Sequence, residues 1–294
     1  MIRASPEPGV IQLRVPVPIV VVLRLPNGFH LAVRPPGMTW ETITLDIDDD
    51  IATLTIDRPD SLNALTVETL ESMEAALAEA ADAGVRALVL EGAGDQAFVA
   101  GADISYMVEL TTPEAQAYAE LGHRVTDTIE TFPAPVIAAI DGYAFGGGSE
   151  LALAADLRVA SEDAVIGQTE IDIGLIPGWG GTQRLARLVD DGTARRMVFL
   201  GERLDAAAAV EAGVVGEVVP AAEFDDRIDE LAGELAAKPA FAMRAAKEAL
   251  NAAHEGSTAA GMALERRAWS GLFGTHDQRE GMRAFVEKRD PEFE

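Results

Sequence analysis

The segment FGGGSELALAADLRVA, residues 145–160, restricts the possible folds more than any other part of the sequence. Each glycine loses more backbone freedom on folding than other residues, yet three stand directly before an alanine- and leucine-rich run that favours a helix. The preceding PVIAAIDG, residues 135–142, has the length and apolar character of a buried strand. The pattern therefore predicts a strand, a loop of bare backbone and a helix in succession, which is typical of an α/β protein.

The rest of the chain after residue 40 shows regular patterns of both kinds. TITLDI and IATLTI alternate apolar and polar residues, as half-buried strands do. Helix starts and ends are marked by threonine, proline and glycine at the positions where caps are expected. The predicted elements are paired strands around the acidic turn 48–50, a helix from Thr66 to Gly84, a strand at 86–92, a long helix opening at 112–114 and ending before Pro133, and an almost wholly helical portion after Gly201.

Composition limits the class of protein and its partners. The chain has 294 residues, of which 48% are hydrophobic, so it can bury a full core and is not expected to be disordered. Its formal net charge of -26 would repel phosphate backbones and anionic lipids, so neither nucleic acid nor a membrane is an expected partner. Only three lysines accompany twenty arginines. This acidic, lysine-poor composition predicts adaptation to a high-salt cytoplasm, with a GC-rich genome as the alternative explanation.

Cysteine and histidine usage excludes several kinds of chemistry. With no cysteine, the chain has no disulfides, thiolate nucleophiles or zinc-finger ligands. The four histidines are scattered without metal-ligand spacing, so no metal site is predicted.

Residues 1–37 differ from everything after them. They hold seven of the fifteen prolines and a single acidic residue, Glu7. Their apolar run is too short and too interrupted by proline for a membrane helix. We interpret 1–37 as a disordered or mispredicted leader ahead of a start at Met38, with a proline-rich interaction arm as the alternative.

The glycine run itself indicates a site for a negative charge. A helix start preceded by glycines presents peptide N–H groups without intrahelical acceptors, together with the positive end of the helix dipole. GGGSEL lacks the spacing of dinucleotide and P-loop motifs, and Glu150 in the first turn would repel a bound phosphate. An oxyanion that forms during a reaction, next to a catalytic carboxylate, agrees better with this sequence.

A second glycine-rich segment, GQTEIDIGLIPGWGGTQRL at 167–185, supports that interpretation. Glu170 follows Glu150 by twenty residues, and each glutamate lies beside glycine-rich turns and apolar runs. Two carboxyl groups can hold one water between them, one accepting a proton while the other donates one. The alternative is that both are solvated surface acids, as most glutamates are in so acidic a chain.

Four motifs occur in order: AGADI, PVIAAIDGYAFGGGSELALAADLRVA, GQTEIDIGLIPGWGGTQRL and REGMRAFVEKR. Together they resemble the crotonase superfamily, and within it the enoyl-CoA hydratases, from about Thr42 to Arg289. The resemblance implies an α/β fold, a crotonase-type spiral of repeated ββα units, with C-terminal helices that assemble trimers, often paired into hexamers. It places the spiral core and its acyl-CoA site at 38–235 and the helical trimerisation region at 236–294.

The resemblance also implies an activity, the reversible syn addition of water to a 2-enoyl-CoA to give a 3-hydroxyacyl-CoA in cytoplasmic fatty acid β-oxidation. The family's two oxyanion-hole N–H groups correspond to Ala102 and Gly147, and its catalytic glutamates to Glu150 and Glu170. In the usual account Glu150 helps to activate water and Glu170 protonates the α-carbon, although the assignment of each proton stays open. No cofactor is implied beyond the coenzyme A of the substrate.

Contacts to coenzyme A are implied more weakly. Arg58 could equally pair with a nearby acid, and Trp269 could equally belong to the core. Two departures from the common family pattern, Ser149 in place of cysteine and Trp179 in place of a smaller residue, leave the acyl chain length open. The residues that correspond to family contacts are Arg58, Ala64, Leu65, Ala100, Asp103, Ile104, Trp269 and Lys288.

Three other functions remain compatible with the motifs. One is an enoyl-CoA isomerase or another acyl-CoA enzyme of the same fold, and another is a non-catalytic acyl-CoA-binding protein. A third is docking on a β-oxidation enzyme partner. The direction of the pathway, the choice between trimer and hexamer and the role of residues 1–37 stay open at this stage.

Overall fold

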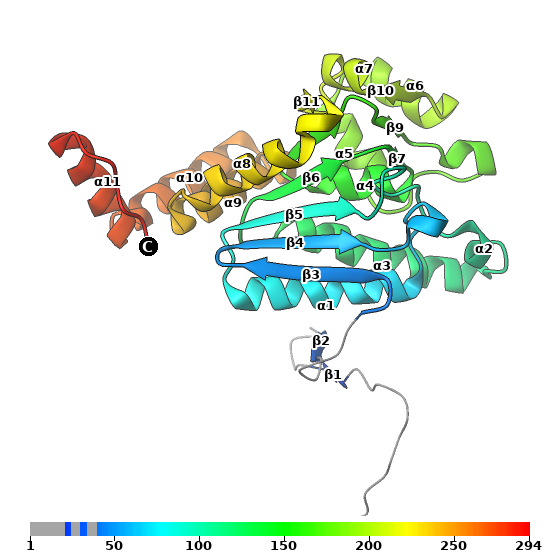
Figure 1. Cartoon of the computed structure of the whole chain (residues 1–294), viewed down its shortest axis with the longest axis horizontal. Helices are drawn as coiled ribbons and strands as arrows, with labels where there is room; N and C mark the ends of the chain where they lie inside the picture. The colour runs from blue at the N-terminus through cyan, green and yellow to red at the C-terminus, as the bar shows by residue number, and fades with distance from the viewer. Residues whose placement is uncertain (1–20, 25–29, 34–39) are drawn as a thin grey trace, which may run out of the picture. The chain divides into compact units, whose positions relative to one another are not determined.

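The computed structural model describes residues 21–24, 30–33 and 40–294 (Figure 1). The chain divides into two compact units, 1–38 and 39–294, and each is described by itself. In the first unit, β1 (Val21–Arg24) pairs with β2 (His30–Val33) in antiparallel orientation. The interpretation of 1–37 as a leader otherwise lies outside the described residues and stays a prediction.

The second unit is built on a six-stranded sheet in the order β11-β8-β6-β5-β4-β3. The predicted strand pair is confirmed as β3 and β4, which are antiparallel, and Asp49 in the turn between them has a φ of 49°. The other neighbouring strands run parallel, so their carboxyl ends lie at one edge of the sheet. The strands are β3 (Ile43–Asp48), β4 (Ile51–Ile56), β5 (Ala87–Gly92), β6 (Val136–Ile140), β8 (Leu157–Ser161) and β11 (Glu217–Val219).

A smaller sheet lies beside the main one in the order β10-β9-β7. It consists of β7 (Tyr143–Phe145), β9 (Val165–Gly167) and β10 (Arg203–Asp205). The prediction that the chain is almost wholly helical after Gly201 missed β10 and β11. Each has only three residues, too few for alternation of apolar and polar residues to be recognised.

Helices cover both faces of the main sheet. Leu88 and Leu90 of β5 belong to the large apolar core that includes Leu70 of α1 (Val67–Ala83) and Val125 of α3 (Thr112–Glu130). On the other face, the intervening residue Val89 packs with Phe224 and Ile228 of α8 (Phe224–Ala236). Strand alternation thus divides the core into two clusters, one on each side of the sheet.

The predicted ends of α1 and α3 are confirmed. Thr66 is the N-cap of α1, where its side chain accepts a hydrogen bond from Thr69 N, and Gly84 ends the helix with a φ of 75°. In α3 the capping box uses Thr111, immediately before the predicted start, with Glu114.

Shorter helices link the strands of the core, and three long helices, α9 to α11, follow α8. Figure 1 shows α9, α10 and α11 extending away from the sheet. Their bounds, with those of the shorter elements, are η1 (Pro59–Ser61), α2 (Ile104–Met107), α4 (Gly147–Ala154), η2 (Glu170–Ile173), α5 (Gly181–Leu188), α6 (Asp191–Leu200), α7 (Ala206–Glu211), η3 (Ala221–Glu223), α9 (Ala240–Glu255), α10 (Thr258–Leu272) and α11 (His276–Glu287).

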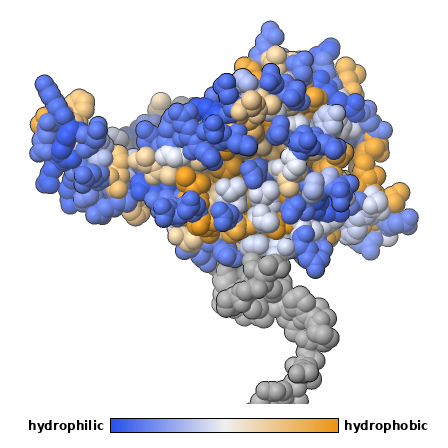
Figure 2. All heavy atoms as spheres, in the orientation of Figure 1, coloured by the Kyte–Doolittle hydropathy of each residue, from blue (hydrophilic) through white to orange (hydrophobic). Residues whose placement is uncertain are grey.

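The C-terminal helices are attached to the core through α9. Lys247, 7% exposed, donates from Nζ to Asp156 Oδ2 at 2.6 Å and to two backbone carbonyls near the end of α3. Beyond α9, large apolar side chains stay exposed, including Trp269 and Phe285 at 64% and 85%. Figure 2 shows apolar patches on an otherwise hydrophilic surface. The trimerisation role of 236–294 stays a prediction that this exposed apolar surface supports.

Candidate active site

A cavity of about 360 Å³ lies at the point where the glycine run begins α4. The loop after β5, α2, α3, α4 and the segment from η2 to α5 all contribute to its walls. Glu150 and Glu170 are the two charged residues among those that line it. Most of the wall is apolar and includes Met107, Leu110, Ala115, Ala119, Leu175 and Ile176.

Gly146 is favoured by its positive φ, and Gly147 and Gly148 are required by close approaches. Gly146 has a φ of 50° and faces the carboxyl group of Glu170. A Cβ atom on Gly147 would lie 2.3 Å from the ring of Trp179, and one on Gly148 would lie 2.0 Å from the carbonyl oxygen of Val99. The sequence pattern predicts a helix that starts at Ser149, after the glycines. The helix instead begins at Gly147, because Gly147 and Gly148 belong to its first turn and Gly146 is the N-cap.

Ala102 and Gly147 both line the cavity, and their peptide N–H groups have no hydrogen-bond acceptor among the described residues. The loop that contains Ala102 is fixed by Leu65, whose N–H donates to Gly101 O at 2.8 Å and whose carbonyl accepts from Asp103 N at 2.9 Å. The structure thus brings together the two backbone groups that the sequence resemblance assigned to an oxyanion hole.

Glu150 is buried and held by backbone donors. Its side chain projects from α4, the residue is 2% exposed, and Oε1 accepts hydrogen bonds from Trp179 N and Gly181 N, each at 2.7 Å. Burial raises the pKa of Glu150 above its usual value, and these N–H groups offset part of that rise by stabilising the carboxylate. The carboxyl group therefore has a fixed direction as well as an unusual affinity for protons.

Glu170, the first residue of η2, lines the same cavity, but its carboxyl group has fewer hydrogen-bond donors than that of Glu150. Its Oε2 is buried and has no hydrogen-bond partner within the described part of the chain. Burial and, second, the charge of Glu150 raise the pKa of Glu170 to about 7. Two peptide donors therefore stabilise the ionised form of Glu150, whereas this oxygen of Glu170 has no such donor.

Trp179 forms a wall of the cavity beside these carboxyl groups. It is 4% exposed, and a Cβ atom on Gly122 of α3 would lie 2.2 Å from its ring, so the indole occupies a slot between Gly122 and Gly147. Its edge meets the ring of Tyr118, whose hydroxyl donates to Leu65 O at 2.7 Å. The large residue at this position is therefore accommodated by a glycine on the neighbouring helix.

Of the predicted coenzyme A contacts, Ala100 and Ile104 line the cavity. Arg58 is engaged within the chain, because it donates to the carbonyl of Ala64 and lies 3.5 Å from the carboxylate of Asp103. The alternative that Arg58 pairs with an acid is thus observed. This ion pair joins the segment that begins at Arg58 to the AGADI motif, which contains Asp103.

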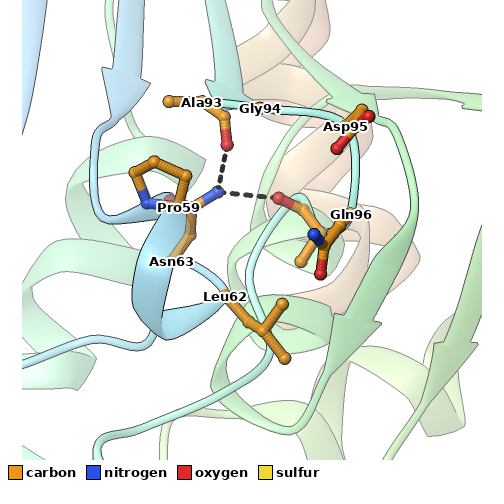
Figure 3. A pocket seen from close by; sticks show the side chains of 8 residues that line it. Pro59, Leu62, Asn63, Ala93, Gly94, Asp95 and Gln96 are labelled. Carbon is orange, nitrogen blue, oxygen red and sulfur yellow. Dashed lines mark hydrogen bonds between the residues drawn. The ribbon is translucent and has the colours of Figure 1, made fainter.

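Asn63 fixes the loop that contains Arg58. Its side-chain Nδ2 donates to the carbonyls of Ala93 and Ala97, at 2.9 and 2.7 Å. Figure 3 shows Asn63 among the residues that line a small pocket. Its Oδ1 accepts from Arg58 N at 2.9 Å. Asn63 thereby holds the segment RPDSLNAL, residues 58–65, against the loop that follows β5.

Trp269 and Lys288 do not line this cavity. Trp269 lies on α10, with its ring edge against Phe273, and Lys288 follows the last turn of α11. That they contact a ligand, from this chain or a neighbouring subunit, stays a prediction.

Two kinds of feature are absent from the described residues. No group of three or more histidine, aspartate or glutamate side chains there is arranged to hold a metal ion. None of the helices in the same part of the chain combines the length and apolarity needed to cross a membrane.

Sequence reasoning missed the groups that hold Glu150. The glycines of PGWGG at 177–181 indicated exposed backbone, but nothing in the sequence showed that Trp179 and Gly181 direct their N–H groups at a carboxylate on another helix. It also missed the apolar wall from Leu175 and Ile176, since such residues have no signature of their own.

Comparison with known proteins shows the family of the chain. Residues 46–294 match the family described as enoyl-CoA hydratase/isomerase. The chain is 41% identical over 212 residues to a crotonyl-CoA hydratase of Syntrophomonas wolfei, covering 72% of this chain and 82% of the relative. It is 43% identical over 212 residues to a mitochondrial enoyl-CoA hydratase of Pongo abelii, covering 72% of each protein.

Solved structures show the same relationship. An enoyl-CoA hydratase from Bacillus anthracis superposes with a TM-score of 0.83 and 36% identity, covering 86% of this chain and 99% of that one. DspI of Pseudomonas aeruginosa superposes with a TM-score of 0.84 and 33% identity, over 89% and 100% of the two chains. The predicted crotonase-type fold is confirmed, and the chain belongs to the enoyl-CoA hydratase/isomerase family.

Proposed function

We propose that this protein is an enoyl-CoA hydratase that adds water reversibly to a 2-enoyl-CoA and forms a 3-hydroxyacyl-CoA. The observation that supports this most strongly is the placement of two buried carboxyl groups and two unpaired peptide N–H groups in one apolar cavity. A hydration needs both a base for water and an acid for carbon, and this pair supplies both. The hydratases of S. wolfei and P. abelii support the same assignment.

The N–H groups of Ala102 and Gly147 would receive the thioester oxygen. As water adds to the β-carbon, this oxygen becomes an enolate, and preorganised donors stabilise the developing charge without reorganisation. Removal of one such donor typically costs about 3 to 4 kcal/mol of transition-state stabilisation. The apolar wall would hold the acyl chain and exclude bulk water.

The two glutamates would exchange protons with the water and the substrate. Glu150, held as a carboxylate by Trp179 N and Gly181 N, accepts a proton from water while the water oxygen bonds to the β-carbon. Glu170 donates its proton to the α-carbon. Afterwards Glu150 carries the proton and Glu170 is ionised, so one proton passes from Glu150 to Glu170 before the next hydration. The pair holds a single proton in both directions of the reaction.

The alternatives are less well supported by this arrangement. An isomerase moves a proton between two carbons and does not require a second carboxyl group to activate water. A non-catalytic binding protein has no use for two carboxyl groups buried at a cost in desolvation. Crotonyl-CoA distinguishes all three: we expect loss of the enoyl-thioester absorbance and formation of 3-hydroxybutyryl-CoA, detected by chromatography. Binding without conversion would contradict hydratase activity.

The pH dependence of hydration follows from the shared proton. Because the pKa of Glu170 is raised to about 7, its proton is present below that pH and lost above it. We expect kcat/KM for crotonyl-CoA to fall about tenfold per unit above about pH 7, since this parameter reports the free enzyme. Steady-state rates between about pH 6 and about pH 9 measure this. The residual activity of Glu170→Gln should lack this decline, and a wild-type rate that stayed constant over the range would contradict it.

Other expectations from the sequence stay part of the proposal. These are assembly of trimers or hexamers, docking on a β-oxidation enzyme, a cytoplasmic location, independence of cofactors and adaptation to high salt. The exposed apolar residues of α9 to α11 support the first, and the net charge of -26 supports the last.

A further inference from the structure

The loop at 178–181 holds Glu150 although its own sequence allows many conformations. Trp179 and Gly181 each donate an N–H to Glu150 Oε1 at 2.7 Å. Three of the four loop residues are glycines, and Gly180 has a φ of 105°. Glycine restricts the backbone least, so groups outside this loop must hold it if both N–H groups are to keep one direction.

Two side chains hold the loop at the carbonyl of Trp179. Arg184 Nη1 donates to this oxygen at 2.9 Å, and Thr126 Oγ1 donates to it at 3.0 Å. The carbonyl belongs to the peptide between residues 179 and 180. The peptides on either side of it supply the two N–H groups that bind Glu150, so fixing the middle peptide fixes both donors.

Arg184 is itself fixed by α3. Its Nε donates to Glu130 Oε2 at 2.9 Å and its Nη2 to Asp127 Oδ1 at 2.8 Å, and its side chain is 11% exposed. A Cβ atom on Gly180 would lie 2.2 Å from Nη1, so the guanidinium reaches the carbonyl only because residue 180 is glycine. A planar guanidinium bound at three places is a rigid support.

Thr126 makes the weaker contact of the two. It is fully buried, and its hydroxyl lies 3.1 Å from His123 O as well as 3.0 Å from Trp179 O. A hydroxyl has one proton to donate, so it is shared between the two carbonyls. Neither Thr126 nor Arg184 lines the cavity, and any effect on the reaction must pass through the loop.

We infer that Arg184 and Thr126 are positioning residues, which hold the 178–181 loop so that its two N–H groups keep Glu150 aligned with its substrate. The inference rests on the proposed hydratase activity for its kinetic consequences, but not for its structural ones. Misplacement of a reacting group by about 1 Å can cost about a hundredfold in rate.

Loss of this support should also change how Glu150 titrates. The ionisable groups that face Glu150 are Glu170 from η2 and His123 from α3, and the loop N–H groups lower its pKa against the effect of burial. If the N–H groups move away, burial acts with less opposition and the pKa of Glu150 rises. The rate should then begin to fall at a higher pH on the acidic side of the profile.

The first test is Arg184→Lys, which keeps the charge but removes the planar fork. With crotonyl-CoA we expect kcat to fall about 10- to 100-fold, KM to stay nearly unchanged and the acidic limb to move to higher pH. Arg124→Lys is the matched control, because Arg124 lies on α3 and pairs with Glu74 at 2.7 Å, away from the loop. Both variants are compared at equal folded fraction, measured by thermal melting.

The second test uses Thr126→Val and Thr126→Ser, together with amide hydrogen exchange at residues 179 and 181. We expect Val to reduce kcat and Ser to restore it, and both amides to exchange faster in Arg184→Lys than in the wild type. Exchange tests the positioning role even if the wild type fails to hydrate crotonyl-CoA, a result that would refute only the proposed function. Unchanged exchange in Arg184→Lys, or an unchanged kcat and acidic limb in an active enzyme, would overturn the inference.

Discussion

Replacing either Glu150 or Glu170 by glutamine is expected to lower kcat for crotonyl-CoA by at least about 10². Glutamine keeps the size of the side chain and much of its hydrogen bonding, but it can neither take a proton from water nor give one to carbon. Affinity for the substrate should change little, because glutamine preserves the shape of the cavity and leaves its apolar wall unchanged. Single-turnover rates and product chromatography separate the chemical step from binding.

The double variant and a control make this expectation sharper. Since the two carboxyl groups act on one water as a unit, Glu150→Gln with Glu170→Gln should be little slower than the slower single variant. Glu109→Gln, at an exposed carboxylate between α2 and α3, should keep wild-type turnover. Full hydratase activity in Glu170→Gln would eliminate the mechanism with two carboxyl groups and favour a reaction that needs one.

A single methyl group on the glycine run is expected to have the largest effect on stability. In Gly148→Ala the new Cβ would lie 2.0 Å from Val99 O, a backbone atom that also accepts a hydrogen bond from Phe145 N. The clash cannot be relieved by rotating a side chain, so the strand pairing next to Ala102 must shift. We expect the free energy of unfolding to fall by at least about 3 kcal/mol, as measured by urea denaturation.

Gly233→Ala on α8 is the matched control for this substitution. It also lies inside a helix, but a Cβ atom there would meet nothing within 4 Å. Alanine restricts the unfolded chain and favours the helix, so we expect a gain of about 0.5 to 1 kcal/mol. Equal effects of the two substitutions would show that the close approach to Val99 does not limit the fold.

Much of the fold and the identity of the central residues could be predicted from the sequence. Alternation in TITLDI and IATLTI predicted β3 and β4, and Thr66 and Gly84 predicted the ends of α1. These features depend on residues close together in the chain, and local preferences determine them. The ordered motifs likewise identified Glu150, Glu170, Ala102 and Gly147, which the structure places around one cavity.

The sequence alone could not show how these groups interact. The short strands β10 and β11 form through pairing with β9 and β8, which lie far from them in the chain. The proton preference of Glu170 arises from its burial and from the nearby charge of Glu150. Likewise, the sequence shows Arg184 only as a charged residue of a predicted helix. The hydrogen bond from Arg184 to the carbonyl of Trp179 forms only in the folded chain.

Sequence by itself determined which residue types are available and the local structures they favour: a bare-backbone helix start, two glutamates and a glycine-rich loop. Tertiary structure decided their chemistry, because a pKa, a hydrogen-bond direction and a cavity depend on distances between segments that are remote in the chain. Glu150 shows this most clearly, since it is an ordinary carboxylate in the sequence. In the fold it becomes a buried group held by two peptides some thirty residues away, at 2.7 Å from each.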